Sequence, residues 1–187
     1  MARCYSDAVS KRHPMIWLIS DERNDAVLES ALARLPRGSG FIFRHYHLAP
    51  ADRRQRFHSL ARLARRCGHV VLLSGTPREA RRWGADGAYG PARQLAQGPD
   101  CLRLAAVHSL NEIGAARRTR ADAVLLSPVF ATRSHPGGTA LGPVRFRLLA
   151  RQSALPMIAL GGMTPHRAGQ LNNHGWAAID GLCGKTR

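Results

Sequence analysis

The sequence predicts an α/β protein folded as a compact (β/α)8 TIM barrel. Eight short apolar segments of strand length alternate with amphipathic segments along the 187 residues. Several of the eight are continuously apolar, which is typical of parallel strands covered on both faces. Right-handed crossovers join such strands, and eight of these units close into a barrel. Barrels of this kind usually need about 200 residues or more, so we expect short loops and a truncated last helix. An open doubly wound sheet is the alternative.

The predicted elements follow one another in regular order. In chain order the strands cover residues 15–20, 40–46, 69–74, 86–89, 101–107, 123–127, 156–161 and 176–179. Amphipathic patterns predict helices at residues 25–35, 52–66, 77–83, 109–120, 144–152 and 165–171. In the helix 52–66, Phe57, Leu60, Ala61 and Ala64 form one apolar stripe, with arginines on the opposite face. The segment after Asp86 has room for little more than one turn of helix.

Two of the helices begin with recognisable capping signals. Ser109 followed by Glu112 fits a capping box. Thr164 followed by Pro165 fits an N-cap with proline at the first helical position. These signals place helix starts just after the fifth and seventh predicted strands.

Length and composition favour a single domain over residues 1–187, with residues 1–13 as a poorly ordered arm. No run approaches the roughly 18 apolar residues of a membrane helix. The first apolar run is short and meets Asp21 and Glu22, which is atypical of a secretory signal. The four cysteines are scattered without a CxxC pair, which argues against a disulfide scaffold or zinc ribbon. We therefore expect a cytoplasmic protein that makes no membrane contact.

The chain is strongly basic, with a formal net charge of +16. Such a charge raises the possibility of a nucleic-acid partner. Nearly all of it comes from arginines spread over the helical segments, and no RNA-binding or helix-turn-helix signature accompanies them. Nucleic-acid binding is therefore the less favoured reading. A field of this sign also attracts small phosphorylated anions.

In a barrel, the residues just after each strand line the active face. These positions supply the candidate site residues Arg44, His45, Tyr46, Ser74, His108, Ser127, Gly161, Gly162, Asp180 and Gly181. The Gly161-Gly162 pair stands before a helix start, where glycines let backbone N–H groups approach an anion. The loops after strands seven and eight are the usual phosphate site of barrels. We expect a bulky residue at position 162 to block this site while leaving the fold intact.

The glycine-rich loop of residues 132–139 is the second candidate feature. It is polar and long enough to fold over a ligand. Its side chains Thr132, Arg133, Ser134 and His135 offer donors to phosphate oxygens. The alternative is a surface crossover that holds no ligand.

The stretch ADAVLLSPVFATRSHPGGTALGPVRFRLLARQSALPMIALGGMTPHRAGQL, residues 121–171, resembles the thiamine-phosphate synthase and TenI-like family. In that family a strand ends in G-P-V-F-x-T-x-[ST]-K, and a later one reads P-V-x-A-I-G-G-I. The resemblance implies a (β/α)8 barrel that joins hydroxymethylpyrimidine diphosphate to thiazole phosphate, or a thiazole tautomerase. It assigns the diphosphate to Arg44, hydroxyl contacts to Thr132 and Ser134, and the thiazole phosphate to Gly161 and Gly162.

This chain departs from the family pattern at several functional positions. The glutamine and lysine that flank the arginine fall on Ile42 and Tyr46, and the loop lysine falls on His135. The serine of the last phosphate loop becomes Asp180, whose charge repels a phosphate unless it is paired. The Asn-Asp that carries one magnesium ligand falls on residues 74–75, and the second magnesium aspartate has no counterpart in residues 89–93. Magnesium, the cofactor that the resemblance implies, normally needs carboxylates. Its expected ligands are absent from this sequence, so we predict no metal-ligating residues and assign no cofactor.

Three readings follow from these residues. The first is a transferase of thiamine biosynthesis or the related tautomerase. The histidine that the tautomerase uses falls on residues 127–128 here, where the chain has serine and proline. In that case His108 or His45 would serve as the acid/base group. The second is an altered barrel that only binds a phosphorylated thiazole or pyrimidine ligand, or regulates a partner. The third is a basic nucleic-acid-associated protein. A homodimer is one option for its assembly.

Overall fold

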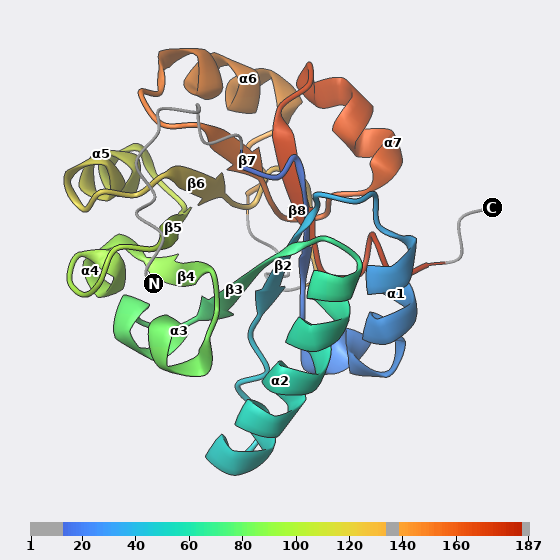
Figure 1. Cartoon of the computed structure of the whole chain (residues 1–187). Helices are drawn as coiled ribbons and strands as arrows, with labels where there is room; N and C mark the ends of the chain where they lie inside the picture. Colours follow the sequence, from blue (N-terminus) through green and yellow to red (C-terminus); the bar gives the residue numbers. More distant parts are fainter. Residues whose placement is uncertain (1–12, 134–138, 185–187) are drawn as a thin grey trace.

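The computed structural model describes residues 13–133 and 139–184, and in it eight parallel strands close into a barrel in sequence order (Figure 1). The ring closes where β8 pairs with β1, with Trp176 opposite Ile16. This closure confirms the predicted fold class and excludes the open sheet. The strands are β1 (Ile16–Ile19), β2 (Gly40–Phe43), β3 (Val70–Ser74), β4 (Gly87–Pro91), β5 (Leu102–Val107), β6 (Ala123–Leu126), β7 (Met157–Ala159) and β8 (Gly175–Ala178).

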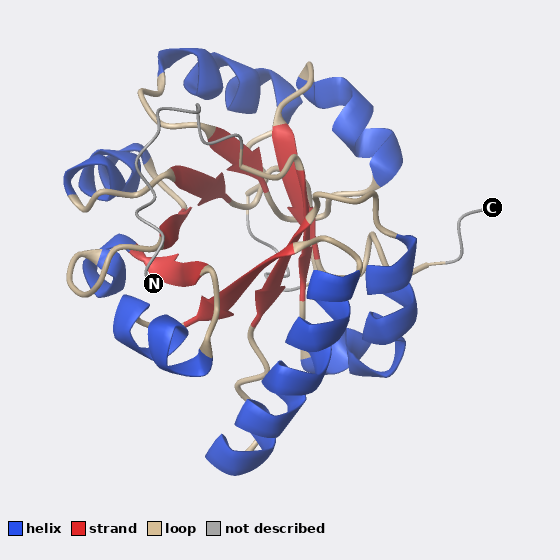
Figure 2. Ribbon diagram, in the orientation of Figure 1, coloured by secondary structure: helices blue, strands red, loops and turns tan. Residues whose placement is uncertain are grey.

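Helices cover the outside of the ring (Figure 2). They are α1 (Leu28–Arg34), α2 (Pro50–Arg66), α3 (Pro77–Trp83), α4 (Ala92–Leu95), α5 (Leu110–Arg118), α6 (Pro143–Gln152) and α7 (Pro165–Ala168), with 3-10 segments η1 (Glu22–Val27) and η2 (Gly169–Leu171). Residues 179–184 after β8 form turns and no helix, as expected for a truncated end. Within the described part of the chain, no helix is long and apolar enough to cross a bilayer.

The hydrophobic core has an inner and an outer layer. Inside the ring, Trp17, Ile42, Leu72 and Tyr89 belong to one buried cluster. A side chain at Gly40 would lie 2.1 Å from the Trp17 ring, so the glycine on β2 makes room for the indole on β1. The outer cluster lies between strands and helices. Since packed side chains fill the interior of the ring, space for a ligand remains only at its ends.

Local signals explain where helices begin and end. The predicted apolar stripe of α2 is buried, with Phe57, Leu60 and Ala64 fully covered. Thr164 caps α7 by accepting a hydrogen bond from the Arg167 N–H at 3.3 Å. The predicted capping box at α5 is only half present. Ser109 accepts from the Glu112 N–H, but the Glu112 carboxylate accepts from the His108 N–H at 2.8 Å rather than from Ser109.

Candidate functional site

A cavity of about 670 Å³ opens at the carboxyl ends of the strands, and every strand from β2 to β8 or its following loop contributes to the lining. The structure brings these sequence candidates together in it: Arg44, Tyr46, Ser74, His108, Ser127, Thr132, Arg133, Gly161, Gly162, Asp180 and Gly181. Ser134 and His135 lie outside the described residues. Tyr89, expected at this face because it follows the fourth predicted strand, also lines the cavity, as do the polar residues Thr164 and Arg167, which were not among the predicted site residues.

The cavity is positively charged. Three arginines line it, Arg44, Arg133 and Arg167, whereas Asp180 is the only carboxylate among the described lining residues. Asp180 is paired, because the Arg23 guanidinium lies 3.5 Å from its carboxylate. Because Arg23 balances its negative charge, Asp180 is compatible with a phosphate bound in the cavity.

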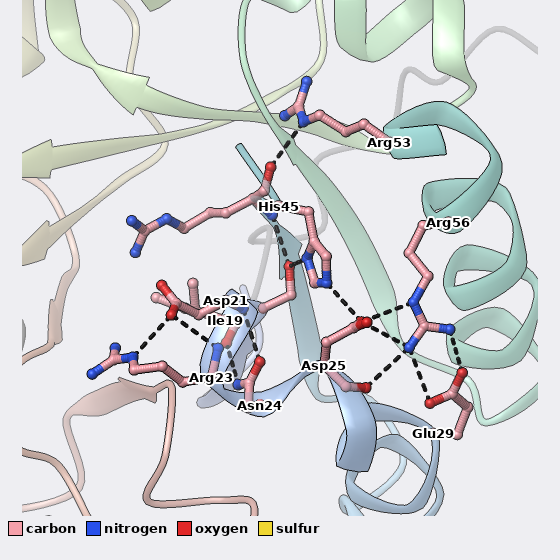
Figure 3. Close-up of polar contacts among 11 residues, drawn as sticks. Ile19, Asp21, Arg23, Asn24, Asp25, Glu29, His45, Arg53 and Arg56 are labelled. Atoms are coloured by element: carbon pink, nitrogen blue, oxygen red, sulfur yellow. Dashed lines mark hydrogen bonds and ion pairs between the residues drawn. The ribbon is translucent and has the colours of Figure 1, made fainter. Parts of the chain in front are cut away.

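Arg23 is itself held at the end of β1 (Figure 3). Its Nε donates to Asp21 at 2.9 Å, and this hydrogen bond raises the pKa of Arg23. Burial favours protonation of Asp21, but the bonds from Arg23 outweigh it and the pKa of that carboxyl is lowered. Asn24 donates to the carbonyls of Ile19 and Ile179 at 3.0 Å each, which joins the loops after β1 and β8. Asp180 therefore faces a cation on a fixed loop.

A chain of hydrogen bonds holds the backbone of Arg44, and its members His45, Asp25 and Arg56 are labelled in Figure 3. The Arg44 N–H donates to Ser20 Oγ at 2.8 Å, and the same oxygen lies 2.8 Å from His45 Nδ1. His45 Nε2 lies 2.7 Å from Asp25 Oδ1, which also accepts from Arg56 Nε at 2.8 Å. Burial lowers the pKa of His45 despite the bond to Asp25. One set of roles satisfies every bond: the Ser20 hydroxyl donates to Nδ1, and a neutral imidazole donates from Nε2.

This arrangement corrects the prediction that His45 supplies an acid/base group. His45 is 1% exposed, is stacked on Phe43 at 4.7 Å, and is not part of the cavity lining formed by the described residues. Its two ring nitrogens are both engaged inside the protein. The structure therefore places His45 behind the described cavity lining, where its contact with Ser20 supports the backbone of Arg44.

Arg53 of α2 joins the ends of β2 and β3. Its guanidinium donates to the Arg44 carbonyl and to the Ser74 carbonyl, each at 2.9 Å. It lies over the Tyr46 ring at 5.3 Å and the Trp83 ring at 5.1 Å. Burial lowers the pKa of Arg53, yet a guanidinium stays protonated at neutral pH. Beside it, the hydroxyls of Tyr46 and Ser74 are hydrogen-bonded to each other.

The two glycines after β7 have positive φ angles, +92° at Gly161 and +60° at Gly162. A Cβ at Gly161 would lie 2.7 Å from Pro128 Cα, and one at Gly162 would lie 2.3 Å from the Ala131 carbonyl oxygen. The Gly162 carbonyl also accepts a hydrogen bond from Arg167. The structure thus contradicts the expectation that a bulky residue at 162 leaves the fold intact, because the loops after β6 and β7 are in backbone contact there.

Two groups in the cavity can donate or accept protons. His108 is about half exposed, and its Nδ1 lies 3.3 Å from the Glu112 carboxylate. Tyr89 is buried in β4, and desolvation raises its pKa to about 12. Tyr89 therefore stays protonated at neutral pH. Of the two histidines predicted as acid/base groups, His108 lines the cavity and His45 does not.

The residues of the cavity do not fit a magnesium ion. No group of three or more His, Cys, Asp or Glu side chains that could hold a metal exists in the part of the chain that the structure describes. Ser74, Gly75 and residues 89–93, the positions to which the resemblance assigns the magnesium carboxylates, contain no Asp or Glu. Mg²⁺ requires hard oxygen ligands, usually carboxylates, and Asp180 already pairs with Arg23.

Comparison with known proteins agrees with the sequence resemblance. A thiamine-phosphate synthase of Chlorobium luteolum is 28% identical over 188 residues, which cover 95% of this chain and 88% of that protein. The thiamine biosynthesis bifunctional protein ThiM/ThiE of Symbiobacterium thermophilum is 28% identical over 181 residues, 91% of this chain. The chain spans only 37% of the length of that bifunctional relative.

Solved structures show the same fold. A thiamine phosphate pyrophosphorylase from Pyrococcus furiosus matches with a TM-score of 0.74 at 20% identity, over 91% of this chain and 86% of that one. FabK from Thermotoga maritima matches with a TM-score of 0.71 at 14% identity, over 91% and 59% of the two chains. The sequence profile of the family described as thiamine monophosphate synthase covers residues 16–182. This chain therefore belongs to the thiamine monophosphate synthase family, whose members serve thiamine biosynthesis.

Proposed function

We propose that the cavity binds a phosphorylated thiazole and a pyrimidine diphosphate and joins them, as in thiamine-phosphate synthesis. The observation that carries the proposal is the cationic lining of Arg44, Arg133 and Arg167 in a cavity of about 670 Å³. Its volume is within the usual range of small-molecule sites, roughly 300–1,000 Å³. Guanidinium groups hold phosphate oxygens in bidentate geometry.

The chemistry of this condensation suits the side chains present. The bond between the pyrimidine methylene carbon and the diphosphate oxygen breaks, and its electron pair leaves with pyrophosphate. The thiazole nitrogen then gives its lone pair to the methylene carbon. No proton transfer is needed, so the protein must bind the departing negative charge and hold the two rings together. Arginines supply the first requirement, and we assign the thiazole phosphate to the loop of Gly161 and Gly162.

Two other candidate functions rest on particular observations. The missing magnesium carboxylates favour a barrel that binds phosphorylated ligands without turnover. His108 in the cavity, next to Glu112, favours the thiazole tautomerase, which requires an acid/base group. The condensation has the advantage that none of the described residues needs to act as a base.

The test is an assay of thiamine phosphate formed from the two precursors, in EDTA and in magnesium. We expect product above the uncatalysed rate, and its loss in Arg44→Ala. Binding of thiazole phosphate by calorimetry with no product would establish the binding-only barrel instead. Isomerisation of the thiazole carboxylate phosphate that is lost in His108→Asn would establish the tautomerase. Steeply salt-dependent binding to nucleic acid, without binding of thiazole phosphate, would overturn all three.

A further inference from the structure

The chain has few carboxylates, and the described ones near the cavity are already engaged. It contains 12 Asp and Glu residues against 28 Lys and Arg. Asp180 lies 3.5 Å from Arg23. Glu79, five residues after Ser74 at the end of β3, accepts from the Thr76 N–H and hydroxyl at 2.9 Å each, in the capping box of α3. A divalent cation entering the cavity would find no uncommitted carboxylate among these groups.

The corner at the ends of β2 and β3 instead presents a pair of hydroxyl groups. Tyr46 and Ser74 are hydrogen-bonded to each other, and both line the cavity. In such a pair one O–H is used within the pair, and the other can donate to a ligand oxygen. Tyr89, opposite Ser74 in the sheet register, adds a third hydroxyl to the same lining.

A fixed cation lies directly behind the hydroxyl pair. Arg53 is held by the carbonyls of Arg44 and Ser74 and by the Tyr46 ring, so its charge cannot move away from the corner. Arg44, whose guanidinium lies 5.6 Å from the Tyr46 ring, places a second positive charge there. These two positive charges attract a phosphoryl group and repel Mg²⁺.

We propose that the corner of Arg44, Tyr46, Ser74 and Arg53 binds the diphosphate of the ligand directly, without a divalent cation. The hydroxyl pair donates to phosphoryl oxygens, and the two guanidinium groups supply the charge that a metal would otherwise supply. This inference rests on the proposed function, because it assigns the diphosphate to one end of the cavity and the thiazole phosphate to the other, at Gly161 and Gly162.

The test is calorimetric titration of the whole chain with inorganic pyrophosphate, once in EDTA and once in excess magnesium. We expect binding in EDTA, with an affinity equal to or higher than in magnesium, because Mg²⁺ competes with the protein for pyrophosphate. Tyr46→Phe and Arg53→Gln should weaken the EDTA affinity by about 5- to 20-fold. Arg62→Gln, an exposed position on the same helix, removes the same charge and should change it less than about 2-fold.

Each result separates this inference from the proposed function. Pyrophosphate binding that appears only with magnesium, or that Tyr46→Phe and Arg53→Gln leave unchanged, overturns the metal-free corner. If thiazole phosphate still binds in that case, the proposed function survives. If neither ligand binds, both fall. Should Arg53→Gln fail to fold, the 63% exposed Tyr46 remains a position where Tyr46→Phe tests the corner.

Discussion

Replacing Gly162 by alanine should destabilise the barrel through two separate effects. Its φ of +60° is left-handed, which costs a residue with a Cβ about 1–2 kcal/mol. The new Cβ would also lie 2.3 Å from the Ala131 carbonyl oxygen and 3.0 Å from Phe130 Cβ. Because the first neighbour is backbone, the loop after β6 has to move, at an overpacking cost of about 1–3 kcal/mol. The expected loss in free energy of unfolding is therefore about 2–5 kcal/mol.

Gly84→Ala shows the first effect alone, so the difference between the two variants measures the second. Gly84 ends α3 with φ +73°, and a Cβ there meets nothing within 4 Å. The Gly84→Ala variant should lose only about 1–2 kcal/mol of unfolding free energy, the cost of the left-handed backbone. The effect of alanine on the entropy of the unfolded chain is the same in both variants. At roughly 2–4 °C per kcal/mol for a domain of this size, thermal and urea unfolding resolve the difference. If Gly162→Ala unfolds no earlier than Gly84→Ala, the backbone contact between the two loops is refuted.

Three further predictions address the cavity and its supports. Arg44→Ala should weaken pyrophosphate binding by about 10- to 100-fold, because it removes a charge-assisted contact; unchanged affinity in calorimetry would remove Arg44 from the site. Burial lowers the pKa of His45 in the folded state. As the pH falls through the ordinary histidine pKa of about 6.5, the unfolded chain therefore binds more protons than the folded one, and the free energy of unfolding should decrease. His45→Asn, which tolerates φ +40°, should flatten that slope in urea midpoints between about pH 7.5 and 5.5; an unaltered slope contradicts a neutral His45. Asp180→Asn should tighten binding of a phosphate monoester about 2- to 5-fold by removing a negative charge, and weaker binding would mean that the carboxylate contacts the ligand itself.

The strands could be located from the sequence because a parallel sheet covered on both faces requires short, continuously apolar segments. Their ends were harder to place. The predicted strand 40–46 ends at Phe43 in the structure. His45 has a φ of +40°, which is outside the extended region, and its ring is hydrogen-bonded to Ser20. The predicted helix 165–171 divides into α7 and η2. Both differences depend on contacts with other loops, which local patterns do not encode.

Site residues that directly follow a strand, such as Arg44, Ser74 and Gly161, could be predicted from the sequence, because the carboxyl ends of all barrel strands meet at one face. Strand order did not separate His45 from its neighbours Arg44 and Tyr46, because the chain leaves the extended conformation at His45, where φ is +40°. The supporting charges were not predictable in this manner. Arg53 reaches the corner from α2, and Arg23 reaches Asp180 from the opposite side of the ring closure. Their partners are fixed by tertiary packing alone.

Charge balance explains why magnesium and its carboxylates would disappear together. Two carboxylates and one Mg²⁺ sum to zero, so removing all three leaves the net charge of the site unchanged. Removing the carboxylates alone would place a doubly charged ion among the arginines of the cavity. At about 6 Å and an effective dielectric constant near 20, each guanidinium would then repel Mg²⁺ by about 5 kcal/mol. The same arginines attract a diphosphate. Arg44 and Arg53 therefore favour the anion over the metal, and the loss of the metal ligands is consistent with the cations that remain.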